Sequence, residues 1–242
     1  MDLEKSLFEA CKEGDLERVR SLLDKEVNIE ARDKLGDTPL ISAIRCRKSN
    51  INIVKTLVEG GADIEAINKD GYTPLIMSSY TNNLDCVKFL VENGADVEAK
   101  DNEGNTPLIY SSWGSLEIVK FLVESLSPNI ESKNIYGRTP LNSASLHGEI
   151  KTINFFLERT NVYIETKDVD GRTPLIMSSL NFNKNKIDSI KLLIEYGANT
   201  EVKDNNGKTF FDYLDEEHQK EIDSFIEDIW SRKNMVKPCK TN

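Results

Sequence analysis

The residues that could do chemistry in this chain are few and widely separated. It has two histidines, His147 and His218, and four cysteines, Cys11, Cys46, Cys86 and Cys239. A zinc site needs such ligands at close spacing, and no Cys-x-x-Cys pair occurs. His147 could serve as a general base, but no serine or cysteine nucleophile with an orienting acid accompanies it in a recognisable arrangement. We therefore expect no catalytic residue, no metal and no cofactor, and we interpret the cysteines as reduced thiols of a cytosolic protein.

The charge of the chain limits its partners. The formal net charge is −10 at pH 7 over 242 residues, so the chain as a whole repels phosphate backbones and anionic lipid surfaces. The all-basic stretch is the tail 231–242, which we interpret as solvated. The N-terminus lacks the pattern of a signal peptide, and no segment approaches the ~18 consecutive apolar residues of a membrane span. We expect no nucleic acid, no membrane and a cytoplasmic location.

A short motif recurs along the whole chain, so the repeated units that it marks must position any binding surface. Gly-x-Thr-Pro-Leu occurs five times, beginning at Gly36, Gly71, Gly104, Gly137 and Gly171, and a degenerate sixth copy begins at Gly207. The repeat period is about 33 residues. Two extra residues near Ser49-Asn50 in the second repeat and three near Asn183 to Lys186 in the sixth are expected between the paired helices. A second apolar run follows in each unit, such as residues 87–91, which end at Asn93-Gly94. This spacing predicts a helical repeat.

The chemistry of the motif predicts how each unit folds. Threonine is a good helix N-cap, and proline suits the first helical position, where its missing N–H would have no partner. The glycine before them permits a sharp turn, and glycine or asparagine after the second run ends a helix. Each unit therefore reads as a turn followed by two short helices, which are marginal alone and must stack. Small residues in the first helix would allow close approach: Ser78, Ser79, Ser111, Ser112, Ala144, Ser178 and Ser179.

On these motifs the chain resembles the ankyrin-repeat family from about residue 3 to residue 230. The resemblance implies an all-α solenoid of helix-turn-helix units with hairpin-like turns and a concave face, in about seven units including two caps. We expect a single domain over residues 1–230, followed by the tail. Its units are an N-terminal cap at 1–32, repeats at 33–67, 68–100, 101–133, 134–167 and 168–203, and a C-terminal cap at 204–230.

The sequence departs from the family pattern at two repeat positions. The histidine that usually follows Thr-Pro-Leu is replaced by Ile41, Ile76, Ile109, Asn142 and Ile176. Isoleucine can substitute apolar packing for the histidine's hydrogen bonds. The asparagine that usually precedes the next hairpin is replaced by Glu30, Glu65, Glu98, Glu131, Glu165 and Glu201. We interpret this column, with basic residues two positions later, as a solvated ridge of both charges.

The resemblance also places the candidate binding surface, since ankyrin proteins usually bind partners through the hairpin tips and the end of the first helix. At the helix end the chain has Arg45, Tyr80, Trp113, Leu146 and Leu180. Large aromatic residues and arginine dominate interface hot spots, although these side chains could instead pack on the next helical turn. With residues of the hairpin tips, the candidate partner-binding set is Tyr72, Tyr80, Trp113, Tyr136, Arg138, Leu146, His147, Arg172 and Leu180.

These expectations favour a non-catalytic scaffold that binds another protein through its concave face, as an adaptor or a stoichiometric inhibitor. The mixed aromatic and basic patch predicted on the later repeats suits an acidic or amphipathic helical target. A host-directed effector, delivered into a host cell, or a regulatory subunit of a partner enzyme is the alternative. Small-ligand or lipid binding is a third class, disfavoured by the acidic charge. We expect a monomer.

Overall fold

The computed structural model describes residues 2–46 and 50–232, and the regular structure in these ranges is entirely helical. The contacts divide the chain into two compact units. The first unit holds residues up to Ser111 and Ser115–Ile135, and the second holds Ser112–Gly114 and the residues from Tyr136 onward. Cys239, the tail beyond residue 232 and the extra residues expected near Ser49 lie wholly or partly outside the described ranges. The all-helical fold class is confirmed within them.

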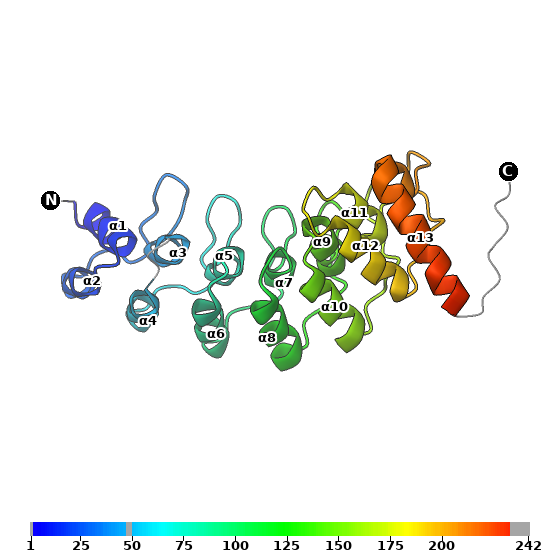
Figure 1. The fold of residues 1–242 in the computed structure, drawn as a ribbon. Helices are drawn as coiled ribbons and strands as arrows, with labels where there is room; N and C mark the ends of the chain where they lie inside the picture. Colours follow the sequence, from blue (N-terminus) through cyan, green and yellow to red (C-terminus); the bar gives the residue numbers. More distant parts are fainter. Residues whose placement is uncertain (1, 47–49, 233–242) are drawn as a thin grey trace. The chain divides into compact units, whose positions relative to one another are not determined.

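The first unit consists of four helix pairs. They are α1 (Leu3–Glu13) and α2 (Leu16–Leu23), α3 (Pro39–Arg45) and α4 (Ile51–Glu59), α5 (Pro74–Tyr80) and α6 (Leu84–Glu92), and α7 (Pro107–Ser111) and α8 (Leu116–Leu126). The first helices of the pairs pack in a row from α1 through α3 and α5 to α7 (Figure 1). The second helices pack in a parallel row from α2 to α8. Each helix of this unit therefore contacts its own partner and its counterpart in a neighbouring repeat of the same unit.

The second unit repeats this arrangement. It consists of α9 (Pro140–His147) and α10 (Ile150–Arg159), α11 (Pro174–Leu180) and α12 (Lys186–Glu195), and the 3₁₀-helix η1 (Phe210–Tyr213) with α13 (Glu216–Arg232). The helix α11 packs between α9 and η1, and α12 packs between α10 and α13. The extra residues of the sixth repeat lie between α11 and α12, as the sequence predicts.

The Thr-Pro-Leu motif starts the first helix of each repeat in the predicted way. The hydroxyl oxygens of Thr38, Thr73 and Thr106 each accept a hydrogen bond from the backbone N–H three residues later, at 3.2–3.3 Å. Thr139 adds a reciprocal bond, because its N–H donates to the Asn142 side chain at 3.1 Å. The proline that follows each threonine occupies the first turn. The motif thus fixes where each repeat begins.

Apolar and small side chains fill the space between neighbouring repeats. Ile41, Ile76 and Ile109 are fully buried, which confirms that isoleucine packs at the position where histidine was expected. Burying such a side chain contributes about 1.5–3 kcal/mol. Asn142 is also buried and donates to the carbonyl oxygen of Thr166 at 3.2 Å. The predicted small residues of the first helices are likewise buried.

Both ends of the chain carry the apolar faces predicted for caps. Leu7, Ala10, Val19 and Leu22 are buried in the N-terminal pair. In α13, Ile222 is buried, and the side chains of Phe225, Ile226 and Ile229 are partly covered. Each cap therefore buries one face against its neighbouring repeat and presents charged residues on the other.

Candidate protein-interaction surface

Each hairpin tip is held by an aspartate or asparagine at its first position. The side-chain oxygen of Asp101 accepts hydrogen bonds from the N–H groups of Glu103 and Asn105, at 2.9 and 2.7 Å. The same pair of bonds, to the residues two and four positions later, occurs at Asp33, Asn68, Asp168 and Asp204. These bonds join residues within one loop, so they order the loop without contacts from other elements. The tips can therefore present side chains at fixed positions.

Neighbouring tips within a unit are also bonded to each other. The N–H of Asn102 donates to the carbonyl oxygen of Asp70 at 3.0 Å, and that of Val169 donates to Tyr136 at 3.0 Å. Gly71 has a φ of +82°, and a Cβ there would lie 2.7 Å from the Asn102 nitrogen. Glycine is required at this point both for its backbone conformation and for the close approach.

In the first unit the predicted residues Tyr72 and Tyr80 lie together, joined by a third ring that the sequence analysis did not select. The ring of Tyr110 contacts both at centroid distances of 5.5 Å in edge-to-face geometry, and Tyr72 and Tyr80 are 6.0 Å apart. Such pairs contribute about 0.5–1.5 kcal/mol beyond their buried area. Tyr110 is buried, Tyr72 is half-buried and Tyr80 is 50% exposed. We call these three side chains the tyrosine cluster.

A buried carboxylate anchors the tyrosine cluster. The Tyr110 hydroxyl lies 2.5 Å from Asp101 Oδ2 and 2.8 Å from the Tyr72 hydroxyl, and it accepts from Asn105 Nδ2 at 3.2 Å. Burial, followed by the hydrogen bond to Asp101, raises the pKa of Tyr110 far above its ordinary value. Burial also raises the pKa of Tyr72. Both phenols therefore stay neutral at physiological pH.

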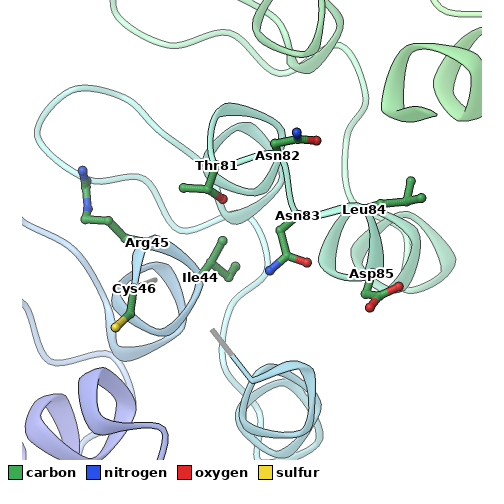
Figure 2. A pocket seen from close by; sticks show the side chains of 8 residues that line it. All are labelled: Ile44, Arg45, Cys46, Thr81, Asn82, Asn83, Leu84 and Asp85. Atoms are coloured by element: carbon green, nitrogen blue, oxygen red, sulfur yellow. The ribbon is translucent and has the colours of Figure 1, made fainter. Parts of the chain in front are cut away.

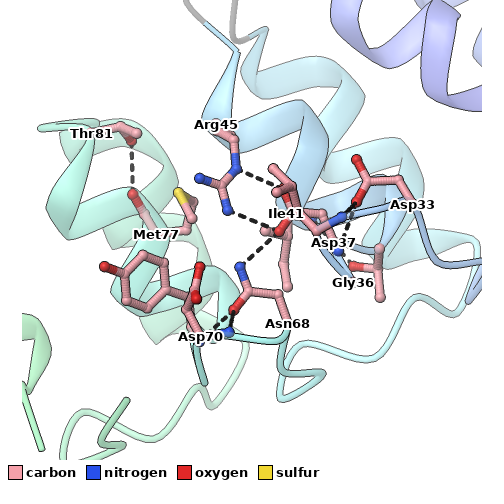
Figure 3. A network of polar contacts seen from close by, with 12 residues as sticks. Asp33, Gly36, Asp37, Ile41, Arg45, Asn68, Asp70, Met77 and Thr81 are labelled. Atoms are coloured by element: carbon pink, nitrogen blue, oxygen red, sulfur yellow. Dashed lines mark hydrogen bonds and ion pairs between the residues drawn. The ribbon is translucent and has the colours of Figure 1, made fainter. Parts of the chain in front are cut away.

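Arg45 does not act as the exposed anchor that its repeat position suggested. Figure 3 shows its guanidinium and the Asn68 side chain converging on Asp37. Arg45 donates to the two Asp37 oxygens at 2.6 and 2.9 Å, and Asn68 Nδ2 donates to Oδ1 at 2.8 Å. The Asp37 side chain is 1% exposed and that of Arg45 is 32% exposed, so this is a partly buried, bidentate ion pair. Its hydrogen bond to Asp37 raises the pKa of Arg45.

In the second unit two pairs of predicted residues come together. The Trp113 and His147 rings stack at a centroid distance of 5.0 Å with an interplanar angle of 20°. His147 Nδ1 lies 2.8 Å from the carbonyl oxygen of Ser143 one turn earlier, so the ring is held from its own helix. The Arg138 guanidinium lies 5.4 Å from the centre of the Tyr136 ring. Trp113 follows the end of α7, and it is half-buried like His147.

The predicted arginines of this unit face carboxylates of their own chain. Arg138 Nε lies 3.9 Å from Asp168 Oδ2, which is fully buried, and Arg172 Nη1 lies 2.7 Å from Asp170 Oδ2. Both arginine side chains remain about one quarter exposed. Leu146 and Leu180, at the ends of α9 and α11, are half-buried. The basic character of this patch is therefore smaller than the sequence suggested.

Charge is distributed unevenly along the repeats. Residues 51–135 contain thirteen acidic and six basic side chains, whereas residues 136–200 contain seven acidic and eight basic ones. The repeats around the tyrosine cluster are therefore strongly acidic, and those around the Trp113–His147 stack are nearly neutral. A charged partner would distinguish the two.

The glutamates of the column are exposed or half-buried, and four of them also bond to the next repeat, which the sequence did not predict. Glu65 Oε1 accepts a hydrogen bond from the Asp96 N–H at 2.8 Å, and Glu98 Oε1 accepts from the Asn129 N–H at 2.7 Å. Glu30 and Glu165 make the same bond to the next repeat. Arg32, which was expected to neutralise the column, donates instead to the carbonyl oxygens of Gly36 and Ile67. These carboxylates tie successive repeats together.

One pocket lies within the first unit, between the end of α3 and the loop from α5 to α6 (Figure 2). Its volume is about 550 Å³, and it is lined by Ile44, Arg45, Cys46 and residues 81–85. The Cys46 thiol donates to the Lys12 carbonyl oxygen at 2.9 Å. Cys11 is buried, and burial raises the pKa of its thiol to about 12, so it stays protonated and unreactive. This chemistry offers polar contacts and no activated nucleophile.

Two further properties hold for the described part of the chain. Within residues 2–46 and 50–232, no group of three or more histidine, cysteine, aspartate and glutamate side chains could hold a metal ion. None of the helices in these ranges combines the length and the apolar character that crossing a bilayer requires.

The comparisons with known proteins agree with the repeat architecture. The model of a family described as ankyrin repeats in three copies matches residues 3–68, 46–134 and 123–204. Among solved structures, the chain is similar to the crystal structure of the ankyrin repeat domain of Bcl-3, described as a unique member of the IkappaB protein family. The TM-score is 0.71 at 21% identity, over 90% of this chain and 97% of that chain, and this likeness shows the fold alone. No curated protein matches the sequence.

Proposed function

Since the chain belongs to the ankyrin-repeat family, we propose that it is a non-catalytic adaptor or stoichiometric inhibitor that captures a partner protein through ordered aromatic side chains. The observation that carries the proposal is the stacked Trp113–His147 pair of the second unit, which holds a large ring partly exposed in a fixed orientation. Tryptophan is among the residues that dominate interface energies, and a ring already fixed in place loses little entropy on binding.

The other predicted residues complete the proposed surface. Tyr136, Arg138, Leu146, Arg172 and Leu180 supply a mixed aromatic, aliphatic and basic rim in the second unit, and Tyr72 and Tyr80 supply the tyrosine cluster in the first. The arginines are partly neutralised by Asp168 and Asp170, so apolar contact contributes more than charge here. An amphipathic helical segment of the partner fits this composition.

We also propose that the protein works in the cytoplasm of the producing cell or of a host cell. Cys11, Cys46 and Cys86 are free thiols, a form that a reducing compartment preserves. Labelling of free thiols in cells quenched with acid and then denatured, so that the buried Cys11 and Cys86 become accessible, would test this. The three cysteines should be labelled without prior reduction, whereas oxidised cysteines would argue for another compartment.

Affinity capture tests the proposed surface. The full chain, the double variant Trp113→Ala with Leu146→Ala, and the control Tyr163→Ala would be immobilised and exposed to lysates of producer and host cells. Tyr163 is an exposed tyrosine of the second unit outside the proposed surface. Mass spectrometry should identify a protein retained by the full chain and the control but not by the double variant. Equal retention by all three would rule out this surface.

A further inference from the structure

The tyrosine cluster is built in a way that favours one kind of ligand group. A hydroxyl can donate only one hydrogen bond, and the Tyr110 hydroxyl donates it to the Asp101 carboxylate at 2.5 Å. The Tyr72 hydroxyl, 2.8 Å away, is then placed to donate to the Tyr110 oxygen. This chain of donors ends on a negative charge, and such chains polarise each member. It makes the Tyr72 ring more electron-rich than that of a solvated tyrosine.

The cluster is also rigid where it is buried and open where it is exposed. Tyr110 is fixed by Asp101 and Asn105, and its ring positions those of Tyr72 and Tyr80 at 5.5 Å. Tyr80 is 50% exposed. An incoming group would therefore meet an ordered aromatic surface and would not need to order it.

The charge around the cluster is negative. The carboxylates of Asp101 and Asp70 act on Tyr72, and residues 51–135 carry an excess of seven acidic side chains. The nearby cations are engaged elsewhere. Arg45 is held by Asp37, and Lys69 Nζ donates to the Lys34 carbonyl oxygen at 2.8 Å. Electron-rich rings within a negative field attract a cation.

We propose that Tyr72 and Tyr80 form the docking point for an arginine-bearing basic segment of the partner protein, an inference that rests on the proposed function. The planar, weakly hydrated guanidinium stacks on aromatic rings better than an ammonium does. The chain makes this kind of contact itself, where Arg138 lies 5.4 Å from the centre of the Tyr136 ring. The first unit thus selects basic side chains, and the second unit selects apolar ones.

The test uses the full chain and a fluorescein-labelled peptide in which arginines alternate with glycine and serine. Matched peptides carry glutamine or glutamate in place of arginine. Fluorescence anisotropy at physiological salt should show binding of the arginine peptide alone. Tyr80→Ala should weaken it about fivefold or more, Tyr80→Phe should keep most of the affinity because the ring remains, and Tyr163→Ala should have no effect. Thermal unfolding of each variant confirms that the exposed substitutions leave the fold intact.

Several outcomes would overturn the inference. Equal binding of the glutamine peptide would show that arginine is not recognised. Unchanged affinity in Tyr80→Ala would assign the binding to general acidic charge. If the full chain fails to bind but a chain ending at Arg232 binds, the basic tail of this chain is the occupant, and the proposed partner segment is wrong.

Failure of this inference is distinguishable from failure of the proposed function. Trp113→Ala with Leu146→Ala should leave the arginine peptide affinity unchanged, because these residues belong to the second unit. If the peptide binds as predicted while that double variant keeps its cellular partner, the second-unit surface is wrong and the tyrosine cluster stands. If the double variant loses the partner and the peptide does not bind, only the basic-segment inference is wrong.

Discussion

The hairpin tips that begin at Asp101 in the first unit and at Asp168 in the second meet the same physical problem in different ways. A hairpin tip that begins with aspartate buries a carboxylate, and a buried charge needs a donor or a counter-charge. In the first unit Asp101 receives the hydroxyl of Tyr110, nine residues later, at 2.5 Å. In the second unit the residue nine positions after Asp168 is Met177, which has no donor, and Arg138 of the preceding tip approaches at 3.9 Å instead.

This difference sets the character of the surface above each carboxylate. A neutral phenol satisfies Asp101 without cancelling its charge, so the tyrosine cluster stays in a negative environment. A guanidinium beside Asp168 offsets part of that charge and also lies 5.4 Å from the centre of the Tyr136 ring. Internal pairing, together with the exposed residues, therefore sets which partner chemistry the surface around each of these two tips can accept.

Among the substitutions that disrupt one of these pairings, Tyr110→Met should have the largest effect. It removes the donor to a buried carboxylate and the ring contacts with Tyr72 and Tyr80, so the free energy of unfolding should fall by about 3 kcal/mol. Adding Asp101→Asn recreates the pairing that the chain already has at Asn68 and Met77, and it should restore about 1 kcal/mol or more. Urea denaturation measures both changes, with Tyr163→Phe as the control. A double variant no better than the single one would refute the donor argument.

Arg138→Met tests the corresponding pair in the second unit. Asp168 would lose its counter-charge, but the pair is 3.9 Å apart and Arg138 is partly exposed, so we expect a smaller loss of about 1–2 kcal/mol. Asp168→Asn in the same chain should recover most of that loss, because the amide keeps the two turn bonds and carries no charge. Thermal unfolding of the single and double variants measures the energetic coupling between Arg138 and Asp168. Additive effects of the two substitutions would show that the residues are not coupled.

Alkaline pH should reveal the tyrosine cluster. The pKa of Tyr110 is raised in the folded chain above its ordinary value of 10.0, so its contribution to stability is complete below pH 10 and is lost as the pH rises further. The urea midpoint should therefore fall between about pH 10 and pH 11 more steeply for the natural chain than for Tyr110→Phe. Parallel curves for the two proteins would show that Tyr110 ionises as freely when folded as when unfolded.

The smallest expected effect concerns a feature that the units share. Glu65→Ala in the first unit and Glu165→Ala in the second each remove one acceptor for a backbone N–H of the next repeat. Each should lower the free energy of unfolding by about 0.5–1 kcal/mol, whereas the glutamine variants, which keep the acceptor, should change it little. Loss of stability in only one unit would show that the column is not equivalent along the chain.

The local structure could be predicted from the sequence because it depends on local chemistry. Threonine caps, the proline after them and the buried isoleucines behave as their types require. The hydrogen bonds of the glutamate column were not predicted because they depend on the spacing between repeats, which no single repeat encodes. Tyr110 was missed because it sits among apolar helix residues. The signal that could have found it is a tip aspartate followed nine residues later by tyrosine, which recurs at Asp204 and Tyr213.

The candidate surface was predictable only in part. His147 follows Leu146, the counterpart of Trp113 in the next repeat, so its place beside the stripe could be predicted, and the structure stacks the Trp113 and His147 rings. Arg45 occupies the same stripe, but its ion pair with Asp37 depends on a side chain at the hairpin tip that was considered separately. The repeat position fixes where the backbone of a residue lies, whereas contacts with side chains of the hairpin tips decide how its side chain is oriented.

Calorimetric titration of the captured partner tests the central claim most directly. The natural chain, Tyr163→Ala and the double variant Trp113→Ala with Leu146→Ala would be titrated under identical conditions. We predict equal Kd values for the first two and at least a tenfold weaker one for the double variant, with an unchanged unfolding temperature. Equal affinity for all three proteins would show that the partner is not held by the second-unit surface.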